Sequence, residues 1–98
     1  MKTIEDIRPI LRSHLPELRE RYNVTSIAVF GSVARGDNAE ASDVDILVDF
    51  SQPVGWEIVH LQLRLEELLG SNVDLVTRNA VVRKPLLWQS IKEDLVYA

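Results

Sequence analysis

Two aspartates separated by one residue, Asp43 and Asp45, are the first feature of this sequence that could do chemistry. On a β-strand, residues i and i+2 point to the same face, so the two carboxylates would project together. Adjacent carboxylates repel unless a cation neutralises them, and Mg²⁺ prefers oxygen ligands of this kind. The alternative is a pair of solvated acids on a half-exposed strand. Asp is unfavourable in strand interiors, and the apolar residues around this pair predict a central strand, which favours a site.

A third acid, Asp74, interrupts another apolar run. A lone acid in such a place is more often an edge residue. A neighbouring strand would bring it beside Asp43 and Asp45, and three carboxylates can hold two metal ions around a displacement at phosphorus. Asp74 would then orient or deprotonate the attacking hydroxyl.

Gly31 and Ser32 directly follow an apolar run and open a segment rich in glycine and polar residues. A strand that turns into a helix N-terminus presents free N–H groups and a positive dipole end, which suit phosphate. Glycine also lets the backbone approach a ligand closely. A plain turn would explain the same dipeptide, and alone the dipeptide favours that interpretation.

The elements that must position these residues follow from apolar spacing and turn residues. Residues 3–22 are predicted as a helix, with Thr3 and Asp6 as a capping box and Pro16 opening a second helical piece near residue 13 or 14. The remaining expected elements are strands at 24–30, 43–50 and 72–77, a short helical turn within 31–42, helices at 55–69 and 81–94, and an edge strand at 96–97. This order predicts an α/β fold with helices packed on a small sheet.

Size and composition narrow the classes of function. A chain of 98 residues fits a single domain, 1–98. The absence of cysteine excludes disulfides, zinc–thiolate sites and thiol catalysis, and it fits the cytoplasm. No signal peptide or membrane span is expected. The net charge of −4 argues against broad nucleic-acid binding, although metal ions allow an acidic site to accept a nucleotide.

The combined pattern is more specific than its parts. Gly31-Ser32, then ten residues, then Asp43-Val44-Asp45 resembles the signature of the DNA polymerase β-like nucleotidyltransferase superfamily. The run FGSVARGDNAEASDVDILV is similar to its smallest branch, the minimal nucleotidyltransferase (MNT) proteins, and the similarity extends over essentially the whole chain. The resemblance implies a polymerase β-like fold with a small mixed sheet.

The resemblance also implies roles for single residues. Asp43 and Asp45 would bind two Mg²⁺ ions, and Asp74 would complete the second metal site and act as base. Gly31 and Ser32 would hold the phosphates of ATP. The remaining residues that the resemblance places in the nucleotide-binding site are Arg35 and Gly36 of the loop, and Ser42 before the acids. Arg35 would help hold the phosphates, with a salt bridge to Asp37 or Asp49 as the alternative, and Ser42 would serve the nucleotide site or only cap the strand.

MNT proteins are described as antitoxins of HEPN toxins, which are small helical RNases, and transfer AMP from ATP to a tyrosine hydroxyl of the toxin. The resemblance therefore implies a protein adenylyltransferase that forms a hetero-oligomer with a HEPN partner. Two alternatives stay open. One is a non-catalytic antitoxin that neutralises its partner by binding. The other is the catalytic subunit of a two-chain transferase acting on a small molecule or an RNA end.

Other residues have plainer interpretations. Four side chains in or near predicted helices are interpreted as surface, packing or interface residues: His14, His60, Trp56 and Trp88. Stacking on a nucleotide is the alternative for the two tryptophans. Three basic residues follow the third strand: Arg78, Arg83 and Lys84. They are typical of a solvated helix start, and contact with triphosphate or with an acidic partner is the alternative.

Overall fold

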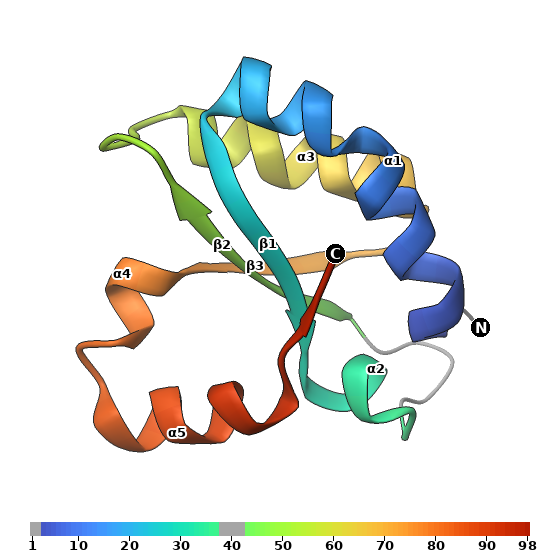
Figure 1. Cartoon of the computed structure of the whole chain (residues 1–98), viewed down its shortest axis with the longest axis vertical. Helices are drawn as coiled ribbons and strands as arrows, with labels where there is room; N and C mark the ends of the chain where they lie inside the picture. The colour runs from blue at the N-terminus through green and yellow to red at the C-terminus, as the bar shows by residue number, and fades with distance from the viewer. Residues whose placement is uncertain (1–2, 38–42) are drawn as a thin grey trace.

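The computed structural model describes residues 3–37 and 43–98. Within these ranges the elements run in the order α1 (Ile4–Tyr22), β1 (Val24–Phe30), α2 (Gly31–Arg35), β2 (Val44–Phe50), α3 (Glu57–Leu69), β3 (Val73–Thr77), α4 (Arg78–Val81), α5 (Pro85–Asp94) and β4 (Val96–Tyr97). Figure 1 shows the four strands crossing the middle of the molecule. The expected positions of all four strands are confirmed to within one residue at each end.

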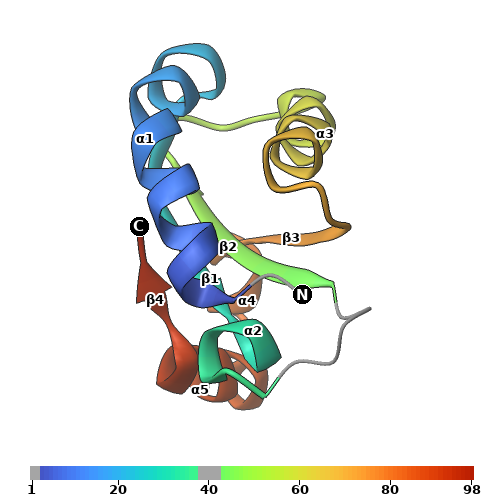
Figure 2. The ribbon, with the colours of Figure 1, turned by 90° about the vertical axis from the view of Figure 1, so that its right-hand side faces the viewer.

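The sheet is mixed, with the strand order β3-β2-β1-β4. Strand β1 pairs antiparallel with β2 and β4, and β2 pairs parallel with β3. Helices α1 and α3 cover one face, while α4 and α5 lie on the other (Figures 1 and 2). Strand β2 is therefore central, as its apolar composition predicts.

The core divides into two clusters, one on each face of the sheet. The larger cluster joins α1 and α3 to the sheet, and β2 contributes Val44, Ile46 and Val48 to it. The smaller cluster is formed by Leu47, Val81 and Ile91, with partly buried side chains around them. Because side chains alternate along a strand, Asp45 shares the face of Leu47. Asp45 therefore lies on the side of the smaller cluster.

Helix α1 is continuous, so the predicted break near residue 13 is wrong. Pro9 and Pro16 both lie inside the helix, and both are exposed. Each proline removes one backbone hydrogen bond, but on an exposed face water can bond the freed carbonyl. Burial of the inward stripe on both sides of Pro16 holds the helix together: Ile7, Leu11, Leu18 and Tyr22. The capping box is confirmed, since Asp6 accepts a hydrogen bond from the Thr3 N–H at 3.0 Å.

The last helix begins later than predicted, at Pro85 instead of residue 81. Proline is favoured at the first helical position, where its missing N–H has no partner to lose. The residues before it form the separate short helix α4, which the sequence did not predict as an element of its own. Thr77 begins α4 as its N-cap, because its Oγ1 accepts a hydrogen bond from the Ala80 N–H at 3.2 Å.

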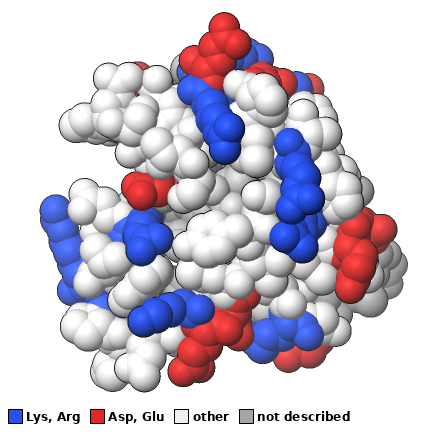
Figure 3. Space-filling model, in the orientation of Figure 1, with Lys and Arg blue, Asp and Glu red and all other residues white. Residues whose placement is uncertain are grey.

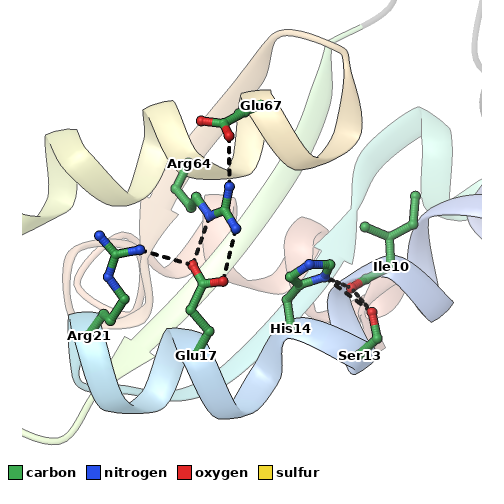
Figure 4. A network of polar contacts seen from close by, with 7 residues as sticks. All are labelled: Ile10, Ser13, His14, Glu17, Arg21, Arg64 and Glu67. Carbon is green, nitrogen blue, oxygen red and sulfur yellow. Dashed lines mark hydrogen bonds and ion pairs between the residues drawn. The ribbon is translucent and has the colours of Figure 1, made fainter.

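A network of charged side chains joins α1 to α3 (Figure 4). Arg64 donates two hydrogen bonds to Glu17, at 2.7 and 2.9 Å, and a third to Glu67 at 2.8 Å. Arg21 lies 3.5 Å from Glu17 on the same helix. His14 contacts the Ile10 carbonyl beside this network, which agrees with its interpretation as a packing residue. The network fixes the two helices that cover the face opposite the acids.

The two tryptophans differ in their surroundings. Trp56 is 80% exposed, so it is not a core residue. Trp88 is half-buried in the smaller cluster, with the Arg78 guanidinium 5.2 Å from its ring centre. Among the described residues no helix has the length and the apolar composition that crossing a membrane requires.

Candidate active site

Strand pairing gathers the acids at the first residues of β2 and β3. In the parallel pair, Asp45 lies directly across from Asp74. On its other side, Asp45 lies across from Phe30, the last residue of β1. Asp43 immediately precedes β2. Two neighbouring strands and the end of a third thus place three acids and the start of α2 in one region of the sheet.

The start of β3, which carries Asp74, is held by side chains of α3. The Val73 N–H donates to Glu66 at 3.0 Å, and Gln62 donates to the Val73 carbonyl at 3.1 Å. Within the described part of the chain β3 is an edge strand with no strand beyond it, so side chains bond these backbone groups instead. The two contacts therefore fix the backbone next to Asp74.

The surroundings of Asp45 disfavour its charged form. Its side chain is half-buried, whereas Asp43 and Asp74 are exposed. Burial raises the pKa of Asp45 above its ordinary value, and the charges of Asp74 and Asp43, with a hydrogen bond to Asp74, raise it further. Arg35 opposes this shift only weakly. A positive charge placed between these carboxylates would relieve their repulsion.

Gly31 fits against Asp45 more closely than any other residue could. Its φ is +73°, a left-handed conformation that side chains rarely adopt. A Cβ atom at this position would overlap Oδ2 of Asp45. Both the backbone conformation and the contact therefore require glycine, and the first turn of α2 lies directly beside the central carboxylate.

The rest of α2 supports this contact. Ser32 is its second residue and is half-buried. The first N–H groups of a helix have no partner within it, so they are available to an anion. Gly36 ends the helix with a φ of +83°, and its N–H donates to the Ser32 carbonyl at 2.9 Å. In the structure Gly36 thus serves the turn after α2.

Arg35 forms the salt bridge to Asp37, which is the alternative to phosphate binding that the sequence left open. It donates to Asp37 at 3.1 Å and also to Asp94 of α5 at 2.7 Å. The second contact joins α2 to α5, and no sequence signal predicts it because the two residues are 59 positions apart. Asp49, the other expected partner, lies at the far end of β2 and accepts from the Phe50 N–H. Ser42 lies outside the described residues.

The three aspartates offer only carboxylate oxygens as ligand atoms, and a hard cation such as Mg²⁺ prefers these. Asp45 and Asp74 contact each other, and the charge of Asp43 acts on Asp45. Within residues 3–37 and 43–98, no three acidic, histidine or cysteine side chains form a ready metal cluster. Binding a metal ion would therefore require at least one of these carboxylates to turn towards the others.

With this geometry in place, comparison with known proteins decides the family. A model of the nucleotidyltransferase domain matches residues 11–98. The chain belongs to the nucleotidyltransferase domain family. This assignment and the mixed sheet confirm the resemblance to minimal nucleotidyltransferases and the predicted fold class.

Relatives of this nucleotidyltransferase are known from archaea and from solved structures. The protein adenylyltransferase MntA of Thermococcus cleftensis is 45% identical over 98 residues, covering 99% of this chain and 97% of MntA. A solved structure of a proposed minimal nucleotidyltransferase is 33% identical, with a TM-score of 0.77 over 97% of this chain and 95% of that one. A toxin–antitoxin structure with AMP-PNP is 26% identical, with a TM-score of 0.62 over 91% and 66% of the two chains.

Proposed function

We propose that this chain is a Mg²⁺-dependent protein adenylyltransferase that moves AMP from ATP to a hydroxyl group of a partner protein. The observation that carries the proposal is Asp45, half-buried between Asp74 and the first turn of α2 and close to Asp43. An acid held against a second acid and a glycine-led helix turn is costly to the fold. Such a site is expected where a metal-bound triphosphate is the ligand.

The proposed roles follow from position. Asp43, Asp45 and Asp74 would hold Mg²⁺, which neutralises the triphosphate and stabilises the charge that develops at the α-phosphorus. The N–H groups at Gly31 and Ser32 would bind phosphate oxygens. Arg35, now paired with Asp37 and Asp94, lies close enough to Asp45 to act on its charge, so it would contribute to phosphate binding at longer range.

The reaction itself is a displacement at phosphorus. The acceptor hydroxyl oxygen forms a bond to the α-phosphorus of ATP, and the bond from that phosphorus to the oxygen bridging it to the β-phosphorus breaks. The hydroxyl proton passes to the Asp74 carboxylate, which is exposed and so can reach an incoming hydroxyl. Pyrophosphate leaves with both electrons of the broken bond.

The proposed acceptor is a tyrosine hydroxyl of a HEPN toxin, and the proposed biological role is that of its antitoxin. MntA of Thermococcus cleftensis, a protein adenylyltransferase, shares 45% of its residues with this chain. The structural neighbour with AMP-PNP is a toxin–antitoxin complex. These relatives favour a protein acceptor over the small-molecule and RNA acceptors that the sequence leaves open.

The acceptor class can be tested by offering several acceptors to one enzyme preparation. Purified protein is incubated with α-labelled ATP, Mg²⁺ and either a HEPN toxin encoded beside it or a short RNA. We expect label on the toxin, none on the RNA, and none when EDTA replaces Mg²⁺. A toxin in which the labelled tyrosine is changed to phenylalanine should stay unlabelled. Label on the RNA alone would contradict the proposal.

A further inference from the structure

One segment that the candidate active site does not use carries basic residues and no acids. Residues 75–92 contain four Lys or Arg and no Asp or Glu, whereas the other 80 residues hold all 15 acids and only seven Lys or Arg. In the structure this segment forms the end of β3, α4, the connection after it and most of α5. Arg83 and Lys84 lie in that connection, both exposed. Within the described part of the chain, neither forms an ion pair.

A cleft of about 680 Å³ lies beside this basic segment. It is formed between the β2–α3 connection and α4, and the left side of Figure 3 shows the molecule hollowed there. Val54, Ile58 and Val82 give it apolar walls. Arg78 and Asp49 place one charge of each sign in it. The cleft is thus an apolar hollow with few, defined polar groups, which is the character of a binding site.

Exposed apolar side chains lie on the segments that line the cleft and on the helix that follows them. Trp56, 80% exposed, falls between the lining residues Val54 and Ile58 in sequence. The lining residue Val82 is 41% exposed, and Leu86, at the start of α5 and outside the lining of the cleft, is 87% exposed. Isolated surface leucines are ordinary, but several bulky apolar groups on neighbouring segments mark an interaction surface. We call Val82, Arg83, Lys84, Leu86 and Leu87 the α4–α5 rim.

We propose that the cleft and the α4–α5 rim are the docking surface for the acceptor protein, which inserts an apolar side chain flanked by acidic residues. The proposal rests on the proposed function, because it assigns a surface to that partner. The apolar walls bind the inserted side chain, and Arg83 and Lys84 pair with the flanking carboxylates. Charge complementarity of this kind selects the partner and speeds the encounter.

The position of the cleft suits an acceptor. Asp49 of the cleft and Asp45 of the candidate active site lie on the same face of β2, four residues apart, which corresponds to roughly 13 Å along the strand. Leu47 and the smaller cluster cover the sheet between these two acids, so a protein seated in the cleft would extend a hydroxyl group past that cluster to reach the acids.

Two other occupants fit the surface less well. In a symmetric dimer the same patch faces itself, which would bring Arg83 and Lys84 of two copies together with no acid in either rim. A nucleic acid would use the basic residues, but Asp49 in the cleft would repel its phosphates and Leu86 would gain nothing from them. A partner with an apolar side chain between acidic residues uses both the apolar walls and the basic rim, provided that its acids pair with Arg83 and Lys84 and stay away from Asp49.

The test measures binding of the HEPN toxin without ATP, so its result does not depend on transfer. We expect Leu86→Asp to weaken toxin binding at least 10-fold in calorimetry. The double charge reversal Arg83→Glu/Lys84→Glu should weaken binding and reduce its salt dependence. Matched controls are Leu63→Asp, an exposed leucine of α3 outside the cleft, and Arg19→Glu on α1, both of which should bind as the wild type does.

ATP binding is the folding control for each variant. A variant that still binds ATP as the wild type does is folded, and we expect this of all of them. If Leu86→Asp and Leu63→Asp bind the toxin with equal affinity, the rim has no special role in binding and the proposal is overturned. The proposal would also be overturned by light scattering that shows a dimer of this chain dissociated by Leu86→Asp, or by RNA binding that the charge reversal abolishes. If the toxin binds through the rim but receives no AMP, the docking surface stands and the proposed function fails.

Discussion

At the scale of single residues, the contact between Gly31 and Asp45 determines how close the backbone of α2 comes to the acids. Gly31→Ala should lower the free energy of unfolding by about 1–2 kcal/mol, the cost of a left-handed conformation for a residue with a Cβ. It should also displace the Asp45 carboxylate and remove AMP transfer. Urea unfolding and a transfer assay measure the two effects.

Gly36→Ala is the matched control for this change. Gly36 is also left-handed, with a φ of +83°, but a Cβ there would meet nothing within 4 Å. Both variants should lose similar backbone stability, while only Gly31→Ala should lose activity. Equal activity in the two would show that the contact with Asp45 is unimportant.

Asp45→Asn should stabilise the protein at neutral pH. The raised pKa of Asp45 means that the folded state binds a proton more readily than the unfolded state. The charged carboxylate therefore costs stability above its folded pKa, and this cost disappears as the pH falls through that value. The melting temperature of Asp45→Asn should exceed that of the wild type at pH 7, with a difference that shrinks in acid. A difference independent of pH would contradict this origin.

The position of Asp45 in the sheet could be predicted from the sequence because the reasons for it are local. Side chains alternate along β2, so Asp45 lies on the other face of the sheet from the buried Val44 and Ile46. An acid within such an apolar strand is unusual, which marks it as a candidate. Trp56 could not be placed in the same way. It lies just before the first turn of α3, where helical spacing does not yet decide which side chains face the core.

At the scale of elements, the contact between α1 and α3 is carried largely by Glu17 and Arg64. A double-mutant cycle with Glu17→Gln and Arg64→Met should give a favourable coupling energy. Because the Arg64 contact lowers the pKa of Glu17 from 4.5, the wild type gains this stability above that pH and loses it as the pH falls through the lower folded value. Additive single and double variants would show that the two side chains do not interact in solution.

Pro16 offers a separate test of helix α1. Pro16→Ala would restore one backbone hydrogen bond in an exposed helix interior, at the cost of a more flexible unfolded chain. We expect a gain of about 2 kcal/mol in the free energy of unfolding. Leu18→Ala, in the buried stripe next to it, should instead lose about 2–5 kcal/mol. If Pro16→Ala destabilises the protein, the helix does not continue through this position.

The strands could be predicted from the sequence more closely than the helices. Each strand is an apolar run bounded by turn residues, whereas α1 continues through a proline because its buried stripe outweighs a local rule. The separate helix α4 depends on the cap at Thr77, and a single threonine is a weak signal in the sequence. The pairs Glu17–Arg64 and Arg35–Asp94 join residues 47 and 59 positions apart, so only the fold reveals them.

At the scale of the whole molecule, the face of the sheet that carries the acids also carries the cleft and the basic segment. The molecule would therefore recognise its partner with one end of this face and modify it at the other. An antitoxin that acts by transfer should fail when Asp43 and Asp45 are both changed to asparagine, even though it still binds. Cell growth with the toxin measures this, and full protection by the double variant would favour neutralisation by binding alone.

The most direct measurement of the central claim compares Asp45→Asn with Asp49→Asn in the transfer of label from α-labelled ATP to the toxin. Both acids lie on the same face of the same strand, but only Asp45 lies beside Asp74 and Gly31, whereas Asp49 lines the proposed docking cleft. At a toxin concentration that saturates binding, the structure predicts that Asp49→Asn labels the toxin at a rate close to the wild type, and that Asp45→Asn does not label it. Transfer by Asp45→Asn at the rate of Asp49→Asn would contradict the assignment of the active site.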